Sequence, residues 1–462
     1  MNSKVKPFGI KDKIGYMCGD MGNVFSFALA SAFFMKFYTD VMGVSPAIIG
    51  TMMLIAKVID AFTDIGMGQI VDRTPRTQNG KFLQWIKRMA GPVALASFLL
   101  YPVWFKDMSM TFKIIWMYGT YILWGSICYT SINIPYGSMA SAISENPDHR
   151  TELSTFRTIG AQIGQFTISV IGPMLVYYTD DAGNKVLSGT AMSKFVVLCS
   201  VLAVIAYMVC FRFTTERVNI PKSTERFSFV DTFKLMFSSR ALIGLIIAAL
   251  LYLVAMTTVN GMNSYLYPNY FKNVKALSLI GTTQLVITFI MAAIVPKLSA
   301  KFGKKEVTSV GLLAAGISYL IAYFLKIEDV KMFVVFVLIY QVGMAFQGIT
   351  SWAMVIDVID DLEIKKNRRD DGAIYGAFSF SRKLGQALSS GLTGFLLSVI
   401  NYGPETKFDP VVTSRIYNIS TLIPAMALIL AALTYTFIYT LSRKKVYENA
   451  EYLHKSRLEN QK

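Results

Sequence analysis

The chain has 462 residues, of which 53% are hydrophobic and only 16% are charged. Soluble domains carry about 25% charged residues, so this composition excludes an ordinary soluble protein and indicates an integral membrane protein. The net charge of +16 does not indicate nucleic-acid binding, because Lys and Arg gather in short loops on alternate sides of apolar segments, as the positive-inside rule requires.

Twelve apolar segments recur along the chain, each long enough to span ~30 Å of hydrocarbon as a tilted helix. An even number of spans places both termini on one side, and the basic loops mark that side as cytoplasmic. The polar, basic start is not typical of a cleavable signal peptide. We expect a multi-pass protein of the cell membrane, plasma or inner, with predicted segments centred on Phe27, Ile59, Ala94, Trp124, Ile163, Val201, Ala249, Ile287, Gly316, Tyr340, Gly385 and Ala427.

The longest cytoplasmic loop separates the segments into two sets of six. A basic turn follows the second segment of each set, GQIVDRTPRTQNGKF and AAIVPKLSAKFGKKE, which suggests a duplicated bundle. We expect an all-α membrane protein with two six-helix bundles around a central cavity, the architecture of alternating-access carriers. The expected parts are a first bundle at 1–214, a linker loop at 215–240, a second bundle at 241–442 and a cytoplasmic tail at 443–462.

The first segment carries polar residues in the run GYMCGDMGNVFSF. Asp20 and Asn23 lie there among glycines that permit close helix packing. Asp20 either takes part in binding or coupling, or lies partly hydrated near the cytoplasmic entrance. Lys36, further out, either snorkels to the outer interface or faces the cavity as a substrate-binding residue.

The second segment holds the most informative residues, Asp60 and Asp64, in LIAKVIDAFTDIGMGQIVDR. Four residues is about one helical turn, so both carboxylates point to one face. A carboxylate at the bilayer centre costs ~2.5–3.5 kcal/mol, so the pair needs positive partners. A transient cation is the functional candidate, and a nearby Lys or Arg is the structural one. Lys57 can lie on the same face and neutralise part of the charge.

Three further segments carry polar groups at membrane depth. The fourth has Thr130, whose hydroxyl either binds a cation or bonds its own backbone, and Asn133, an amide suited to sugar hydroxyls. The fifth has Arg157. The eleventh has Arg382 and Lys383, of which one can face the cavity, because helix neighbours point about 100° apart. Lys383 paired with an aspartate forms either a coupling network or a static link.

Nothing in the sequence indicates an enzyme. Phosphate-binding loops and nucleophile–base pairs are lacking, so uphill transport requires an ion gradient, Na⁺ or H⁺, and no other cofactor. The four cysteines lie in apolar surroundings without metal-ligand spacing, and the two histidines are far apart.

At these residues the chain resembles the glycoside–pentoside–hexuronide:cation symporters of the major facilitator superfamily, over nearly its whole length. The likeness is strongest at GYMCGDMGN, FYTDVMG, KVIDAFTDIGMGQIVDR, NGKF, NIPYGSM and FSFSRKLGQA. It implies the major facilitator fold, a monomer, a sugar substrate and a monovalent coupling cation.

The melibiose-permease branch of this family implies specific roles. Asp60, Asp64 and Thr130 match its cation-binding residues, and Thr63 stands where that branch has an asparagine. The arginine and lysine near its sugar and cation sites match Arg157 and Lys383 in this chain.

The sugar site departs from that branch. Val24 and Asn133 replace the two aspartates that hold galactosyl hydroxyls there, and Gly137 replaces the aromatic platform. The NIPYGS and FSFSRK stretches look more like glucuronide and xyloside permeases. We expect a neutral pentoside or short β-glycoside, bound by Asn23, Asn133 and tyrosines, because Asp60 and Asp64 offset two of the cavity cations.

Three alternatives stay open at this point. An anionic hexuronide would suit the cations Lys36, Lys57, Arg157 and Lys383. A sodium-coupled lysolipid carrier would need a laterally open apolar cavity. A non-transporting sugar sensor would need a signalling partner on the cytoplasmic loops.

Overall fold

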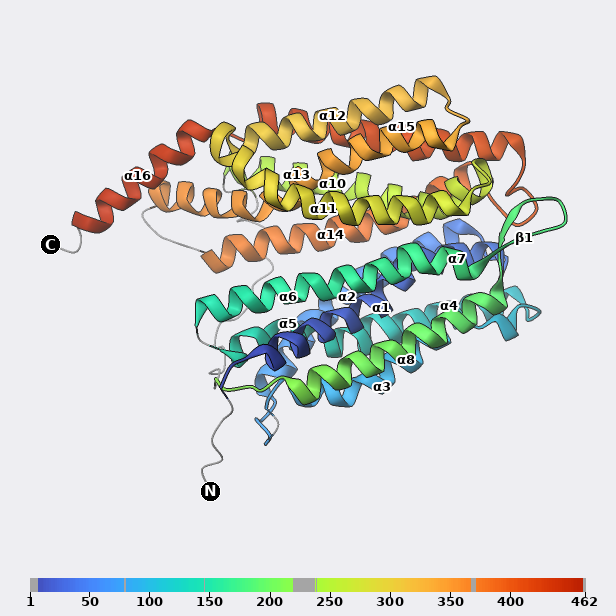
Figure 1. The fold of residues 1–462 in the computed structure, drawn as a ribbon, viewed down its shortest axis with the longest axis horizontal. Coiled ribbons are helices and arrows are strands. Elements are labelled where there is room, and N and C mark those ends of the chain that lie inside the picture. The colour runs from blue at the N-terminus through green and yellow to red at the C-terminus, as the bar shows by residue number, and fades with distance from the viewer. Residues whose placement is uncertain are drawn as a thin grey trace. The chain divides into compact units, whose positions relative to one another are not determined.

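The computed structural model describes residues 7–78, 80–144, 146–218, 237, 239–366 and 371–459. They form long helices and one short antiparallel hairpin, in which β1 (Tyr177–Thr179) pairs with β2 (Lys185–Leu187) (Figure 1). The chain divides into two compact units.

Unit 1 comprises Met1–Glu225, Tyr267–Gly281 and Gly394–Asp409. In it, helix α1 packs against α6 and α8, and the contact with α6 requires a glycine. A Cβ atom at Gly160 would lie 2.1 Å from the carbonyl oxygen of Met17. The helical elements are α1 (Ile10–Asp40), α2 (Pro46–Arg73), α3 (Leu83–Leu99), η1 (Val103–Phe105), α4 (Met110–Ile122), η2 (Leu123–Tyr129), α5 (Thr130–Ile143), α6 (Pro147–Phe166), η3 (Thr167–Ile171), α7 (Gly172–Val176) and α8 (Gly189–Phe213).

Unit 2 comprises Arg226–Leu266, Thr282–Thr393 and Pro410–Lys462. Helix α12 packs against α13 and α15, and α15 also packs against α10. The remaining helices among the described residues, some of which contribute their ends to unit 1, are α10 (Arg240–Tyr265), η4 (Leu266–Tyr270), α11 (Val274–Phe302), α12 (Lys304–Leu325), α13 (Val330–Lys366), α14 (Asp371–Val399), α15 (Pro410–Phe437) and α16 (Arg443–Glu459).

Each of the predicted apolar segments is helical in the structure. Among the described residues, eight segments are long and apolar enough to cross a membrane: α3, α6 to α7, α8, α10 with η4, α11, α12, α13 and α15. The other predicted segments are α1, α2, the continuous run α4–η2–α5, and α14. Most of the candidate polar residues lie on these, and their side chains lower the mean hydropathy. Their membrane crossing therefore remains a prediction.

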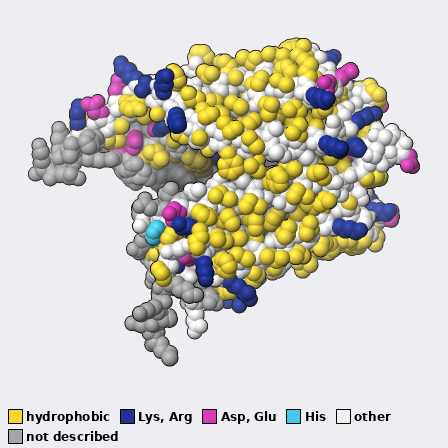
Figure 2. All heavy atoms as spheres, viewed as in Figure 1, with side chains coloured by type: hydrophobic (Ala, Val, Ile, Leu, Met, Phe, Trp, Pro, Cys, Tyr) yellow, Lys and Arg dark blue, Asp and Glu magenta, His cyan; other side chains and the backbone are white. Residues whose placement is uncertain are grey.

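The exposed surface is that of a protein in lipid. Large apolar side chains such as Phe324 and Val310 are 72% and 68% exposed. Figure 2 shows hydrophobic side chains over the middle of the visible helices, whereas the charged side chains gather toward the helix ends. Such an apolar surface is costly in water and neutral against lipid tails.

The predicted domain limits fall near helix ends. Helix α8 ends at Phe213, α10 begins at Arg240, and α16 begins at Arg443. Most of the predicted linker 215–240 lies outside the described residues. The six-and-six division remains a prediction, because the compact units do not follow it throughout: 267–281 and 394–409 pack with unit 1.

Candidate functional site

Helix α2 presents both predicted carboxylates to one neighbouring element. Ser126 Oγ donates to Asp60 Oδ1 over 2.5 Å, and Thr130 Oγ1 donates to Asp64 Oδ1 over 2.9 Å. Both donors belong to the η2–α5 run. The prediction that the two carboxylates share a helix face is therefore confirmed.

Lys57 supplies a built-in positive charge to this cluster. Its Nζ lies 3.1 Å from Asp60 Oδ2, and the two side chains are 20% and 17% exposed. The same ammonium lies 5.3 Å from the ring centroid of Phe27. Two carboxylates, one ammonium and two hydroxyls thus lie close together. Carboxylate and hydroxyl oxygens are ligands that suit a hard cation.

The partner element is a π-helix, η2, a wider turn that recurs at functional sites in other proteins. Besides Asp64, the Thr130 hydroxyl reaches the carbonyl oxygen of Gly125, five residues earlier, over 3.1 Å. Gly125 itself lies beside Asp60, since a Cβ atom there would be 3.5 Å from Asp60 Oδ1.

Thr63 is oriented differently. Its hydroxyl donates to the backbone carbonyl of Asp60 over 3.2 Å, so the structure does not bring it to the carboxylate oxygens. No group of three or more His, Cys, Asp or Glu side chains converges within the described part of the chain. The oxygen ligands available to a cation here are therefore the two carboxylates with the hydroxyls of Ser126 and Thr130, a hard-oxygen set.

Arg157 and Asp20 form an ion pair between α6 and α1. Arg157 Nε donates to Asp20 Oδ1 over 3.0 Å, and the guanidinium carbon lies 5.5 Å from the Tyr136 ring centroid. The Arg157 side chain is 44% exposed and that of Asp20 is 11% exposed. A predicted substrate-binding residue and a predicted coupling residue are thus in direct contact, and their roles remain predictions.

The two asparagines expected at the sugar site also meet. Asn23 Nδ2 lies 3.5 Å from Asn133 Oδ1, and Tyr207 Oη donates to Asn23 Oδ1 over 3.0 Å. The contact joins α1, α5 and α8. These amides and the hydroxyl are neutral hydrogen-bonding groups, and their role in sugar binding remains a prediction.

The Lys36 side chain is buried and does not extend to the protein surface. Its side chain is 1% exposed, and its ammonium lies 2.9 Å from Asp40 Oδ2, 3.0 Å from Asn269 Oδ1 and 2.7 Å from Tyr402 Oη. Tyr402 also donates to Asp40 Oδ1 over 2.8 Å. In this structure Lys36 is held in a buried polar cluster of unit 1, and a substrate contact remains a prediction.

Lys383 belongs to α14 by its backbone, but its side chain lies outside the described residues. Its neighbour Arg382 lines a cavity of about 130 Å³ in unit 2, together with Tyr252, Gln347 and Trp352.

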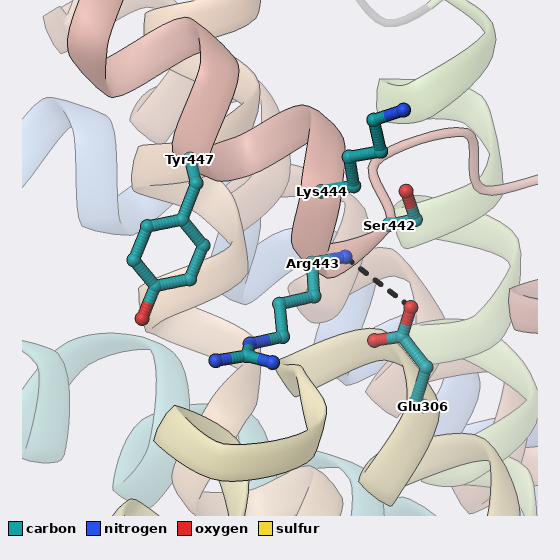
Figure 3. Close-up of a pocket in the computed structure, with 5 residues that line it drawn as sticks. All are labelled: Glu306, Ser442, Arg443, Lys444 and Tyr447. Carbon is teal, nitrogen blue, oxygen red and sulfur yellow. Dashed lines mark hydrogen bonds between the residues drawn. The ribbon is translucent and has the colours of Figure 1, made fainter.

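A larger hollow, of about 470 Å³, lies at the start of α16 and is lined by Glu306, Ser442, Arg443, Lys444 and Tyr447 (Figure 3). The backbone N–H of Arg443 donates to Glu306 Oε1 over 3.2 Å. Large pockets are the default place to look for a ligand. This one lies at helix ends among exposed charged residues, so its position does not suit a transport site.

Sequence reasoning missed several of these partners. Ser126 lies four residues before Thr130, the same one-turn spacing that relates Asp60 to Asp64. This spacing could have predicted that Ser126 contacts Asp60. Tyr207, Asn269 and Tyr402 have no such signal, because they contact residues 184 to 366 positions away.

The helical fold is that of a membrane carrier, and the sequence comparisons place the chain in a carrier family. The family described as MFS/sugar transport protein matches residues 15–443. The chain belongs to this family, within the glycoside and hexuronide symporters of the major facilitator superfamily, as the resemblance indicated. It is a multi-pass membrane protein of a sugar-transporter family and not an enzyme.

Among curated relatives, the chain is 30% identical over 453 residues to the "Uncharacterized symporter YjmB" of Bacillus subtilis, covering 97% of this chain and 96% of that protein. It is 30% identical over 438 residues to the "Glucuronide carrier protein homolog" of Escherichia coli, covering 94% and 93%. A solved bacterial homologue of the iron transporter ferroportin, in an inward-facing state, shares the fold with a TM-score of 0.66. It is 13% identical, and the match covers 93% of this chain and 98% of that one.

Proposed function

We propose that this protein is a cation-coupled symporter that moves a sugar into the cell by alternating access, as a monomer with both termini in the cytoplasm. The cargo is one sugar together with Na⁺ or H⁺. The family membership supports the sugar, and the symporter name of the Bacillus relative supports coupling to an ion.

One observation supports the proposal most directly. Asp60 and Asp64 lie on α2 in an apolar stretch of sequence, and each accepts a hydrogen bond from a hydroxyl of the η2–α5 run. Lys57 pairs with Asp60, and the Asp60 and Asp64 carboxylates with the Ser126 and Thr130 hydroxyls offer oxygen ligands that suit a coupling cation.

The proposed substrate class is supported by polar side chains other than those of the cation site. Asn23, Asn133 and Tyr207 offer neutral hydrogen-bonding groups, which supports a neutral pentoside or short β-glycoside. The relative named as a glucuronide carrier homologue supports the alternative, a hexuronide.

The proposal is tested by replacing each carboxylate with its neutral isostere, Asp60→Asn and Asp64→Asn, in the purified protein in vesicles. We expect both variants to lose sugar accumulation above the external concentration under a Na⁺ or pH gradient. Asp181→Asn, in the exposed loop between β1 and β2, is the matched control and should accumulate sugar normally. Accumulation at the unaltered level by both Asp60→Asn and Asp64→Asn would refute the cation site.

A further inference from the structure

Arg382 is a charged side chain of α14 for which the described part of the chain provides no acidic partner within ion-pair distance. It lies near the middle of α14 and is half-buried. An arginine in a membrane helix costs ~2.5–3.5 kcal/mol and almost always pairs or faces a polar cavity.

The cations that were expected to attract an anionic substrate in unit 1 differ in this respect. Lys36 is paired with Asp40, Lys57 with Asp60, and Arg157 with Asp20. Their carboxylate partners offset most of the attraction that these groups would exert on an anion. The unpaired charge of Arg382 therefore distinguishes its surroundings from those sites.

Arg382 lines the small cavity of unit 2, whose walls come from α10, α13 and α14. Its guanidinium carbon lies 5.3 Å from the ring centroid of Trp352. Stacking on an aromatic face fixes the plane of a guanidinium while its N–H donors stay available at the edge. Tyr252, near the middle of α10, lies within electrostatic range of the same guanidinium.

Gln347 adds a buried polar group to the same cavity. It is 1% exposed, and its Oε1 has no hydrogen bond of ordinary geometry among the described residues. The hydroxyl of Tyr435 interacts with this glutamine. A buried polar atom without a hydrogen bond of ordinary geometry costs about 1–3 kcal/mol, and a ligand hydroxyl in the cavity would donate to Gln347 Oε1.

The cavity limits what can enter it. At about 130 Å³ it is smaller than the ~300–1,000 Å³ of pockets that enclose whole ligands. It has room for a charged substituent and the adjoining edge of a ring. Arginine is the residue that best binds planar or tetrahedral oxyanions, through two parallel N–H donors.

We propose that Arg382, stacked on Trp352 and flanked by Tyr252 and Gln347, is a subsite for the carboxylate or sulfonate group of an acidic sugar. The inference rests on the proposed sugar transport and selects its anionic alternative over the neutral pentoside. The guanidinium binds the anionic oxygens, and Gln347 accepts a hydrogen bond from a neighbouring ring hydroxyl.

The test compares three methyl hexosides that differ only in the group on C5: hydroxymethyl, carboxylate and sulfonatomethyl. Their binding to the full-length purified protein is measured by isothermal titration, and their uptake is measured in vesicles. The variants are Arg382→Gln, which removes the charge, and Arg382→Lys, which keeps the charge without the planar fork. Arg240→Gln, at the start of α10, removes an arginine that donates to the carbonyl of Phe437 and is the matched control.

We expect the unaltered protein to bind at least one acidic sugar more tightly than the neutral one. Arg382→Gln should weaken that acidic sugar at least about tenfold and change the neutral sugar by less than about twofold. Arg382→Lys should bind the acidic sugar with an affinity between those of the unaltered protein and Arg382→Gln. Arg240→Gln should bind it as tightly as the unaltered protein. The acid that binds more tightly identifies carboxylate or sulfonate as the natural group.

Two results would overturn the subsite. One is tight acidic-sugar binding that Arg382→Gln and Arg382→Lys leave unchanged. The other is uptake restricted to the neutral hexoside or to pentosides, which would leave the symporter proposal intact. Absence of binding and uptake for every sugar would instead refute the proposed function as well.

Discussion

At the residue scale, the candidate cation site depends on hydroxyls as much as on carboxylates. Thr130 donates to Asp64, whereas Thr63, one residue before Asp64 in the chain, donates to the backbone carbonyl of Asp60. The two threonines lie near the same carboxylates but only one of them contacts a carboxylate oxygen. This difference allows a matched comparison within one site.

Thr130→Val keeps the shape of the side chain and removes its hydroxyl. A hydrogen bond to a charged group contributes about 1.5–3 kcal/mol, so we expect the apparent affinity for the coupling cation to fall at least about tenfold. Thr63→Val should change it less than about twofold, because its bond is to its own helix. Sugar uptake measured against cation concentration gives both values. An unchanged affinity in Thr130→Val would show that the Thr130 contact does not contribute to the site.

At the element scale, the start of α3 accepts its cap from a residue that is distant in the sequence. Glu216, which follows α8, accepts hydrogen bonds of 2.7 Å from the backbone N–H groups of Lys81, Phe82 and Leu83. An acidic group at a helix N-terminus satisfies free N–H donors and the helix dipole together. Gly80, at φ 110°, leaves the space, since a Cβ atom there would lie 2.4 Å from the Glu216 carboxyl carbon.

Glu216→Gln should therefore destabilise unit 1. The amide has a single oxygen, so at least one buried N–H loses its acceptor, at a cost of about 1–3 kcal/mol. We expect a lower melting temperature for the purified protein. Glu152→Gln is the control, because the Glu152 side chain is 47% exposed and pairs with Lys13, and exposed pairs contribute about 0–1 kcal/mol. Melting temperatures lowered equally by both changes would contradict the capping role.

Local sequence patterns predicted the contacts within one regular helix but not the irregular helix or the contacts between distant segments. The helical period was sufficient to place Lys57, Asp60 and Asp64 on one face, because one turn of a regular helix relates them. It did not predict the π-helix beside them, which departs from that period. Lys36 shows a second limit: two of its partners, Asn269 and Tyr402, come from distant segments, and only folding brings them together.

At the scale of the whole molecule, hydropathy predicted the helical segments and the motif resemblance predicted the family, and both predictions are confirmed. The four segments that fall outside the apolar-span criteria carry residues such as Asp60, Lys36 and Arg382. The polar residues that a carrier needs at membrane depth lower the mean hydropathy of these segments. The substrate was harder to predict, because it depends on which cations are paired, and pairing is a property of the folded chain.

The most direct test of the account is sugar uptake by the unaltered protein in vesicles. Labelled β-xyloside and labelled glucuronide would be supplied under a Na⁺ gradient, a pH gradient or neither, with galactosides and lysolipids as competitors. The account predicts that one gradient drives accumulation of a sugar above its external concentration, that uptake without a gradient only equilibrates, and that lysolipids do not compete. Sugar uptake that is identical with and without both gradients would contradict cation coupling.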